Sequence, residues 1–332
     1  MIPDDRRSEQ LQAWLKDQPG RFTDLALLRA DASFRRYFRL CRDDQPVVLM
    51  DAPPEREATE PFVEIARLLE SLGLRPPRIL AHDPATGFVL LEDLGDRTFT
   101  RALAEEGAAE GPLYDRAIDT LIQLHRAWPA QAAKAPDVPA YDTPRLLDEA
   151  ALFADWYWPE QHGTPMSASL RNGFLAAWRE ALEGLPVLPG TLVLRDFHVD
   201  NLMLPPGEDG DCAVLDFQDA VIGSPAYDVV SLLEDARREV SPATVERALE
   251  RYAAGTAWDP EVFMQHYRVL GVQRTTKILG IFVRLARRDA KPRYLEHLPR
   301  LHRLLAQGLS QPALAPVAGW FQTHMPERMR ED

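Results

Sequence analysis

The sequence predicts an α+β chain with a small β-rich first part and a larger, mostly helical second part. Two observations lead to this fold class. Residues 21–95 read as short β-like runs with one helix among them, and helical periodicity dominates residues 96–332. We expect the domains to divide there, at 1–95 and 96–332. The length of 332 residues fits two parts, at roughly 150 residues per domain.

The first part opens with an expected helix at 8–17. A second helix is expected at 61–72, because apolar residues such as Phe62, Ile65 and Leu69 recur at helical spacing before a natural helix end at Gly73. The rest of this part is apolar or alternating runs bounded by turn residues. The expected strands are 25–30, 34–40, 46–50, 78–83 and 87–94.

The second part carries helix-like periodicity at 99–109, 112–127, 144–158, 166–184, 225–238, 242–254, 259–288 and 292–308. Two short β-like runs interrupt it, at 191–197 and 211–218. They flank a loop rich in proline and glycine at 205–210, so we expect them to form a hairpin inside the helical part.

Composition excludes several classes of protein. The net charge of −13, from 38 basic and 51 acidic residues, disfavours general binding to nucleic acid or anionic membranes. Two cysteines, Cys41 and Cys212, leave no disulfide framework and no cysteine-rich metal site. We find neither a signal peptide nor an apolar run of about 18 residues, so we expect a cytoplasmic protein with no membrane or nucleic-acid partner.

Residues 191–219 contain the candidate catalytic and metal-binding residues. They contain Asp196, then Asn201 five residues later, then Asp216 on the next β-like run. Such loop residues often only cap turns and helices. Together, however, they suit phosphoryl transfer from Mg-ATP: one carboxylate accepts the proton of the attacking hydroxyl, while an amide oxygen and a second carboxylate hold Mg²⁺.

This stretch resembles the aminoglycoside phosphotransferase group of kinase-like small-molecule kinases, and PAYDVVSLL (225–233) resembles the helix that follows in that group. The strings ADASFRRYFRL, VVLMDAPP, VLLEDLGD and QRTTKILGIFVRL look most similar to the anomeric kinases of bacterial cell-wall recycling. Those enzymes phosphorylate N-acetylmuramate and N-acetylglucosamine on the 1-hydroxyl. The resemblance implies a bilobal protein-kinase-like fold, with a nucleotide-binding first lobe, ATP and Mg²⁺.

The resemblance also implies residue roles. Asp196 would be the catalytic base, Asn201 and Asp216 the Mg²⁺ ligands, and Asp228 a brace of the catalytic loop. LLEDLG (90–95) would be the hinge whose backbone holds adenine. The hinge residues concerned are Glu92, Asp93 and Leu94.

The chain departs from the kinase pattern at Met50, which occupies the slot of the usual third-strand lysine. Residues 17–133 contain no lysine at all, so the first lobe cannot supply one. Arg35 and Arg36, in a 31–37 turn that resembles the flap over the phosphates, are candidates for the replacement cation. The alternative is that either arginine is a solvated strand residue.

Candidates for the sugar site are weaker. Glu149 and Trp156, on the 146–158 helix, offer a carboxylate and an aromatic ring for a pyranose, or they belong to a core helix. Asp219 either accepts a sugar hydroxyl or caps a turn, and His198 either touches substrate or braces its loop. Leu194, two residues before Asp196, stands where many relatives have a bracing histidine.

Arg274 lies in the 265–288 segment, where basic residues interrupt an apolar stripe. They meet either the protein's own acids or an anion, such as ATP phosphate or the carboxylate of a muramate. We therefore expect a monomeric amino-sugar kinase with a small-molecule sugar as its partner. The alternatives are a kinase for an aminoglycoside or choline-like acceptor, and a nucleotide-binding pseudokinase.

Overall fold

The computed structural model describes residues 6–30, 34–105, 109–207 and 212–329. Residues 31–33 of the expected flap lie outside this range. The chain divides into two compact units. The first comprises Met1–Ala109, Ala130–Pro136 and Val199–Asp219, and the second comprises Glu110–Pro129, Asp137–His198 and Ala220–Asp332.

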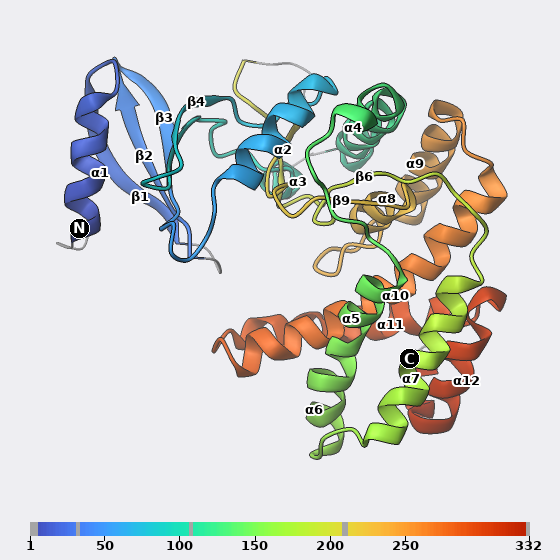
Figure 1. Ribbon diagram of the computed structural model, residues 1–332. Coiled ribbons are helices and arrows are strands. Elements are labelled where there is room, and N and C mark those ends of the chain that lie inside the picture. Colours follow the sequence, from blue (N-terminus) through green and yellow to red (C-terminus); the bar gives the residue numbers. More distant parts are fainter. Residues whose placement is uncertain (1–5, 31–33, 106–108, 208–211, 330–332) are drawn as a thin grey trace. The chain divides into compact units, whose positions relative to one another are not determined.

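The first unit is built on a five-stranded antiparallel sheet with the order β1-β2-β3-β5-β4 (Figure 1). Its elements are α1 (Arg6–Asp17), β1 (Phe22–Ala30), β2 (Arg36–Arg42), β3 (Gln45–Asp51), α2 (Glu60–Ser71), β4 (Ile79–Asp83), β5 (Phe88–Glu92), α3 (Phe99–Ala104), β7 (Leu202–Met203) and β8 (Ala213–Val214). The expected helix and strand pattern of residues 8–94 is confirmed within a few residues at each end.

Helix α1 covers one face of this sheet. Leu11 and Trp14 of the helix form one buried core with Phe38, Leu49 and Leu90 of the strands. Side chains alternate between the two faces of a strand, so the neighbours of Leu49 on β3 point to the other face. The alternation therefore divides β3 into a face toward α1 and an opposite face that carries Val48 and Met50.

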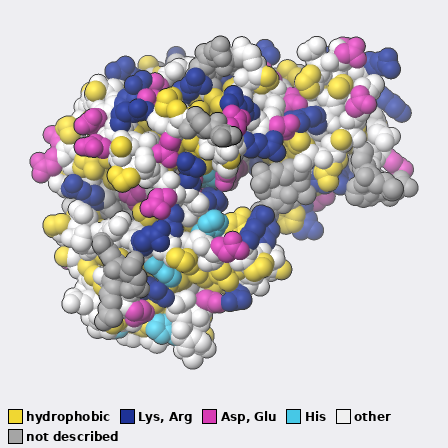
Figure 2. Space-filling model, turned by 180° about the vertical axis from the view of Figure 1, so that it is seen from behind, with side chains coloured by type: hydrophobic (Ala, Val, Ile, Leu, Met, Phe, Trp, Pro, Cys, Tyr) yellow, Lys and Arg dark blue, Asp and Glu magenta, His cyan; other side chains and the backbone are white. Residues whose placement is uncertain are grey.

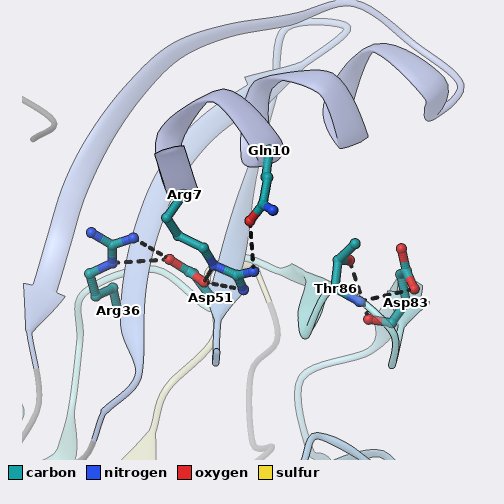
Figure 3. A network of polar contacts seen from close by, with 6 residues as sticks. All are labelled: Arg7, Gln10, Arg36, Asp51, Asp83 and Thr86. Atoms are coloured by element: carbon teal, nitrogen blue, oxygen red, sulfur yellow. Dashed lines mark hydrogen bonds and ion pairs between the residues drawn. The ribbon is translucent and has the colours of Figure 1, made fainter. Parts of the chain in front are cut away.

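A buried carboxylate ties α1 to the sheet at the end of β3. Asp51, whose side chain is fully buried, accepts hydrogen bonds from Arg7 of α1 at 2.6 and 2.8 Å and from Arg36 of β2 at 2.6 and 3.0 Å. Figure 3 shows the two guanidinium groups on either side of the carboxylate. The Arg7 guanidinium also lies 4.1 Å from the ring centroid of Phe88.

The second unit is mostly helical. Its elements are α4 (Glu110–Gln131), α5 (Thr143–Leu152), a π-helical turn (Phe153–Tyr157), α6 (Trp158–His162), α7 (Ala168–Glu183), β6 (Thr191–Val193), β9 (Val221–Gly223), α8 (Ala226–Leu233), α9 (Pro242–Gly255), α10 (Pro260–Arg287), α11 (Leu298–Leu309) and α12 (Ala315–His324). Helix α10 packs against α5, α8 and α11. The sequence analysis did not expect α12, β7 or β9.

The expected hairpin between 191–197 and 211–218 is wrong. Strand β6 pairs with β9 inside the second unit, whereas β8 pairs with β7 inside the first. Each of these strands is only two or three residues long, which is too short for a side-chain alternation that would identify its partner. The polypeptide thus leaves the second unit after His198 and returns to it at Ala220.

Helix α10 passes unusually close to the π-helical turn at Gly280. A Cβ atom at this position would lie 2.3 Å from the backbone carbonyl of Leu152 and 2.7 Å from the nitrogen of Phe153. Both distances are far below contact distance, so only glycine permits this approach. Single π-helical turns inside α-helices are uncommon and mark a local irregularity of the helix.

Charge is mixed over the surface. Figure 2 shows lysine and arginine side chains interspersed with aspartate and glutamate over the face in view. Among the described residues, the helices include none that is long and apolar enough to cross a bilayer.

Asp51→Ala should destabilise the protein by about 3–5 kcal/mol, because it leaves two arginines without their buried carboxylate. Urea denaturation followed by circular dichroism would measure the change. Glu105→Gln is the matched control, since it removes a carboxylate from the exposed pair with Arg97, and it should leave the unfolding midpoint unchanged. Equal midpoints for both variants would contradict the structural role of Asp51.

Candidate functional site

The loop that carries Asp196 is held by a buried carboxylate. Asp228, at the start of α8, is fully buried and accepts hydrogen bonds from the backbone N–H groups of Leu194 and Arg195, at 2.7 and 2.8 Å. Burial raises the pKa of Asp228 to about 7, against the opposing effect of the two backbone donors. The role of brace implied for Asp228 agrees with these contacts.

Asp196 is accessible to solvent, although protein atoms crowd it on most sides. Burial acts to raise its pKa, but nearby groups that carry positive charge or can gain it, Lys277 foremost and then His198 and Arg274, outweigh burial and hold the pKa below the ordinary value. Burial lowers the pKa of His198, so this imidazole is neutral near pH 7 and Lys277 is the main counter-charge. Asp196 is therefore an ionised carboxylate, as a base must be.

Glu149 organises the charges around that loop. Its Oε1 accepts from Arg195 at 2.6 Å and lies 2.8 Å from Nζ of Lys277, and its Oε2 accepts from the hydroxyl of Tyr141. Lys277 also donates to the hydroxyl of Tyr227 at 3.3 Å. Both carboxylate oxygens of Glu149 are engaged within the protein, so the structure gives it a positioning role and not the predicted contact with sugar.

Arg274 and His198 do not project from the surface. Arg274 is 5% exposed, and its charge acts on Asp196, Asp228 and Glu234. His198 is also 5% exposed. The alternative that basic residues of this segment meet the protein's own acids holds for Lys277, which pairs with Glu149. The predicted contacts of Arg274 and His198 with substrate remain predictions.

The two other sugar candidates lie in different units. Trp156 is half-buried in the π-helical turn of the second unit, and Asp219 is exposed at the end of the last segment of the first unit. Gln218 donates to Asp219 at 3.5 Å. The sugar contacts of both residues remain predictions.

Asn201 and Asp216 lie together beside the β7–β8 pair. Asn201 Nδ2 donates to Asp216 Oδ2 at 3.4 Å, and the backbone N–H of Leu215 donates to the Asn201 carbonyl at 2.8 Å. Asp216 has a φ of 58°, a left-handed conformation that aspartate tolerates better than most residues. The next residue, Phe217, stacks on Phe62 of α2 with ring centroids 4.9 Å apart, which anchors this loop.

The donor set of Asn201 and Asp216 fits magnesium. An amide oxygen and a carboxylate are hard oxygen ligands, and Mg²⁺ commonly takes one or two protein ligands beside water and phosphate oxygens. In the described parts of the chain, no group of three or more His, Cys, Asp or Glu side chains could hold a metal ion. A site with few protein ligands is the kind that Mg²⁺ accepts.

The predicted hinge is held by arginines. Glu92 binds Arg75 at 2.6 and 2.8 Å and Arg78 at 3.2 and 3.3 Å. Burial acts to raise the pKa of Glu92, but these partners lower it to about 2. Asp93 Oδ1 accepts from the backbone N–H of Gly95 at 2.8 Å, and Leu94 packs with the buried side chains of Met203 and Ala213.

The structure separates Arg35 from Arg36, which the sequence analysis treated alike. Arg36 is bound to Asp51 on the α1 face of the sheet, opposite the face of Met50. Its predicted phosphate contact does not fit this position, because strand alternation turns it away from that face. Arg35 is buried and forms an ion pair with Glu57.

Sequence reasoning missed Arg39 and Arg195, whereas Lys277 belongs to the basic stripe of residues 265–288 that it singled out. Arg39 lies on the same face of β2 as Tyr37 and binds Asp93, at 2.6 Å, and Asp96, at 2.9 Å. Alternation along β2 could have placed Arg39 on this face. The contacts of Glu149 join residues 46 and 128 positions apart in the chain, which no local pattern indicates.

Comparison with known proteins places the chain in a family. The sequence pattern of the phosphotransferase enzyme family matches residues 24–263. The chain belongs to this family.

Relatives of known name match nearly the full length. An N-acetylmuramate/N-acetylglucosamine kinase of Caulobacter vibrioides is 38% identical, with 91% of this chain and 92% of the relative covered. A Pseudomonas aeruginosa protein of the same name is also 38% identical, with 95% and 96% covered.

Solved structures show the same fold at lower identity. A choline/ethanolamine kinase family protein from Mesorhizobium loti superposes with a TM-score of 0.63 at 15% identity, covering 96% of this chain and 99% of that one. A ternary complex of aminoglycoside phosphotransferase APH(2")-IIa with streptomycin and ATP gives a TM-score of 0.59 at 16% identity, with 90% and 96% covered. The bilobal kinase-like α+β fold expected from the sequence is confirmed.

Arg195 precedes Asp196 with a φ of 69°, a conformation that is strained for arginine. Arg195→Gly and Arg195→Ala both remove the ion pair with Glu149, but only glycine relieves the strain. We expect the glycine variant to be more stable than the alanine variant by about 1 kcal/mol. Urea denaturation of the two variants side by side measures this difference, and an alanine variant of equal or greater stability would show that the backbone is unstrained.

Proposed function

We propose that this protein transfers the γ-phosphoryl group of ATP to the anomeric 1-hydroxyl of N-acetylmuramate and N-acetylglucosamine, in peptidoglycan recycling. The observation that carries the chemistry is Asp196, an accessible, ionised carboxylate on a loop that Asp228 braces. The acceptor is proposed from the relatives, which share 38% identity over more than nine-tenths of their length and carry that activity in their names.

In this reaction Asp196 orients the anomeric hydroxyl and accepts its proton as the bond from the sugar oxygen to the γ-phosphorus forms, while the bond from that phosphorus to the β–γ bridging oxygen breaks and ADP leaves. Asp228 keeps the loop backbone in place through its two amide contacts. Lys277 keeps Asp196 ionised, and Glu149 positions Lys277. An anomeric hydroxyl is more acidic than an ordinary alcohol, so a carboxylate of low pKa suffices as the base.

Asn201 and Asp216 would hold Mg²⁺, and the backbone of Glu92–Leu94 would hold adenine. When bound, Mg²⁺ would neutralise negative charge that develops on the phosphate group. The donor chemistry of Asn201 and Asp216 supports the metal, and an aminoglycoside phosphotransferase of the same fold is known in complex with ATP. We further propose that the protein acts as a monomer in the cytoplasm, where ATP is available.

Phosphorus NMR tests the activity directly. The purified protein, incubated with Mg-ATP and either sugar, should produce a sugar phosphate that mild acid hydrolyses, because a phosphate on the anomeric carbon is acid-labile. Asp196→Asn, which keeps size and hydrogen bonding but removes the base, should reduce turnover by about 10²–10⁴-fold while ADP affinity stays near that of the wild type.

Each other outcome points elsewhere. An acid-stable phosphate ester would move the reaction to a different hydroxyl. ATP consumption with choline or an aminoglycoside, but with neither sugar, would replace the acceptor. ADP binding without turnover of any acceptor would favour a pseudokinase, for which Met50 in the slot of the strand lysine is the supporting observation.

Lys277→Met should move the acid limb of kcat/KM to higher pH. Removing this positive charge disfavours the ionised form of Asp196, so the pKa of that carboxyl rises and more alkaline conditions are needed to form the base. Lys277→Arg, which keeps the charge, should leave the limb nearer its original position. An identical pH profile for wild type and Lys277→Met would show that Lys277 does not act on the base.

A further inference from the structure

The strand position that holds a lysine in kinases carries no charge in this chain. Met50 is on β3, directly opposite Tyr37 of β2 and Val89 of β5, and its side chain is fully buried. Residues 17–133 contain no lysine. A nucleotide triphosphate nevertheless needs a cation near its phosphates, because these carry most of its negative charge.

The register of the sheet shows which arginines share the face of Met50. Residues directly opposite each other in an antiparallel pair lie on the same face, so Tyr37 is on the face of Met50 and Arg39 is on the face of Val48. Arg35 directly precedes β2, which begins at Arg36, and its ion pair with Glu57 ties it to the segment that follows β3. Arg36 has the opposite parity and binds Asp51 on the α1 face.

Arg39, in the middle of β2, and Arg35, just before this strand, are held by different acids. Arg39 binds Asp93 and Asp96, at the predicted adenine hinge. Arg35 is 6% exposed and pairs with Glu57, in the segment between β3 and α2. The contacts of Arg39 thus hold it at the hinge, and those of Arg35 hold it beside the segment that follows β3.

We propose that Arg35 binds the nucleotide phosphates in place of the strand lysine, and that Glu57 holds its guanidinium in position. The inference rests on the proposed function, since it assumes a nucleotide against this face. A guanidinium carries five N–H donors and can serve a carboxylate and a phosphate together. The missing positive charge of β3 is thus supplied from the residue that directly precedes the neighbouring strand β2.

Arg36 provides a matched control, because it is the adjacent residue, carries the same charge and points to the other face. Titration calorimetry with ADP in magnesium buffer would compare wild type, Arg35→Ala, Arg35→Lys and Arg36→Ala. We expect Arg35→Ala to weaken ADP binding about tenfold or more, and Arg35→Lys to restore part of the loss. Arg36→Ala should leave the affinity within about threefold, although it removes a partner of the buried Asp51.

The dependence on salt gives a second readout that a merely structural role would not produce. If Arg35 acts on phosphate charge, the difference between wild type and Arg35→Ala should shrink as salt rises. ADP binding by Arg35→Ala equal to that of the wild type, or an equal loss in Arg36→Ala, would overturn the inference while leaving sugar phosphorylation by the wild type intact. A wild-type protein that neither binds ADP nor consumes ATP would remove the proposed function and this inference together.

Discussion

The buried carboxylate of Asp228 is the contact on which the catalytic loop depends. Its two oxygens accept from consecutive backbone N–H groups, those of Leu194 and Arg195, and so fix the peptide from which Asp196 projects. An unpaired N–H at this depth would cost free energy, and a carboxylate satisfies two of them at once. The strained φ of Arg195 persists because these bonds and the ion pair with Glu149 hold it on both sides.

Helices and strands whose sequence pattern lies within a single element were predicted well. Helical spacing found α2, and turn residues separated the strands of the first sheet, because each of these signals is local. Pairings between distant residues could not be predicted in the same way. The strands β6 to β9 are two or three residues long, and Glu149 meets Lys277 across 128 residues of chain, so neither leaves a periodic trace.

Prediction of the site shows the same division. The spacing of Asp196, Asn201 and Asp216 singled out an accessible carboxylate whose pKa lies below its ordinary value, and two side chains, predicted to hold Mg²⁺, that are within hydrogen-bond distance of each other. In the sequence Arg35 and Arg36 looked equivalent, because they are neighbouring arginines with the same charge. They differ in their partners: Arg36 is a strand residue opposite Asp51 and binds it, whereas Arg35 precedes the strand and pairs with Glu57, and neither contact is visible in the sequence.

Gly280 affects the position of Lys277 through the packing of α10. Lys277 and Gly280 are three residues apart on α10, and so lie on nearly the same side of the helix, and the missing side chain at Gly280 lets α10 rest against the backbone of Leu152. Leu152 is the last residue of α5, the helix that carries Glu149. The close approach of α10 to this backbone, one helical turn from Lys277, therefore helps to set the distance between Lys277 and Glu149. The position of the positive charge beside Asp196 depends on the missing side chain of Gly280 as well as on the ion pair with Glu149.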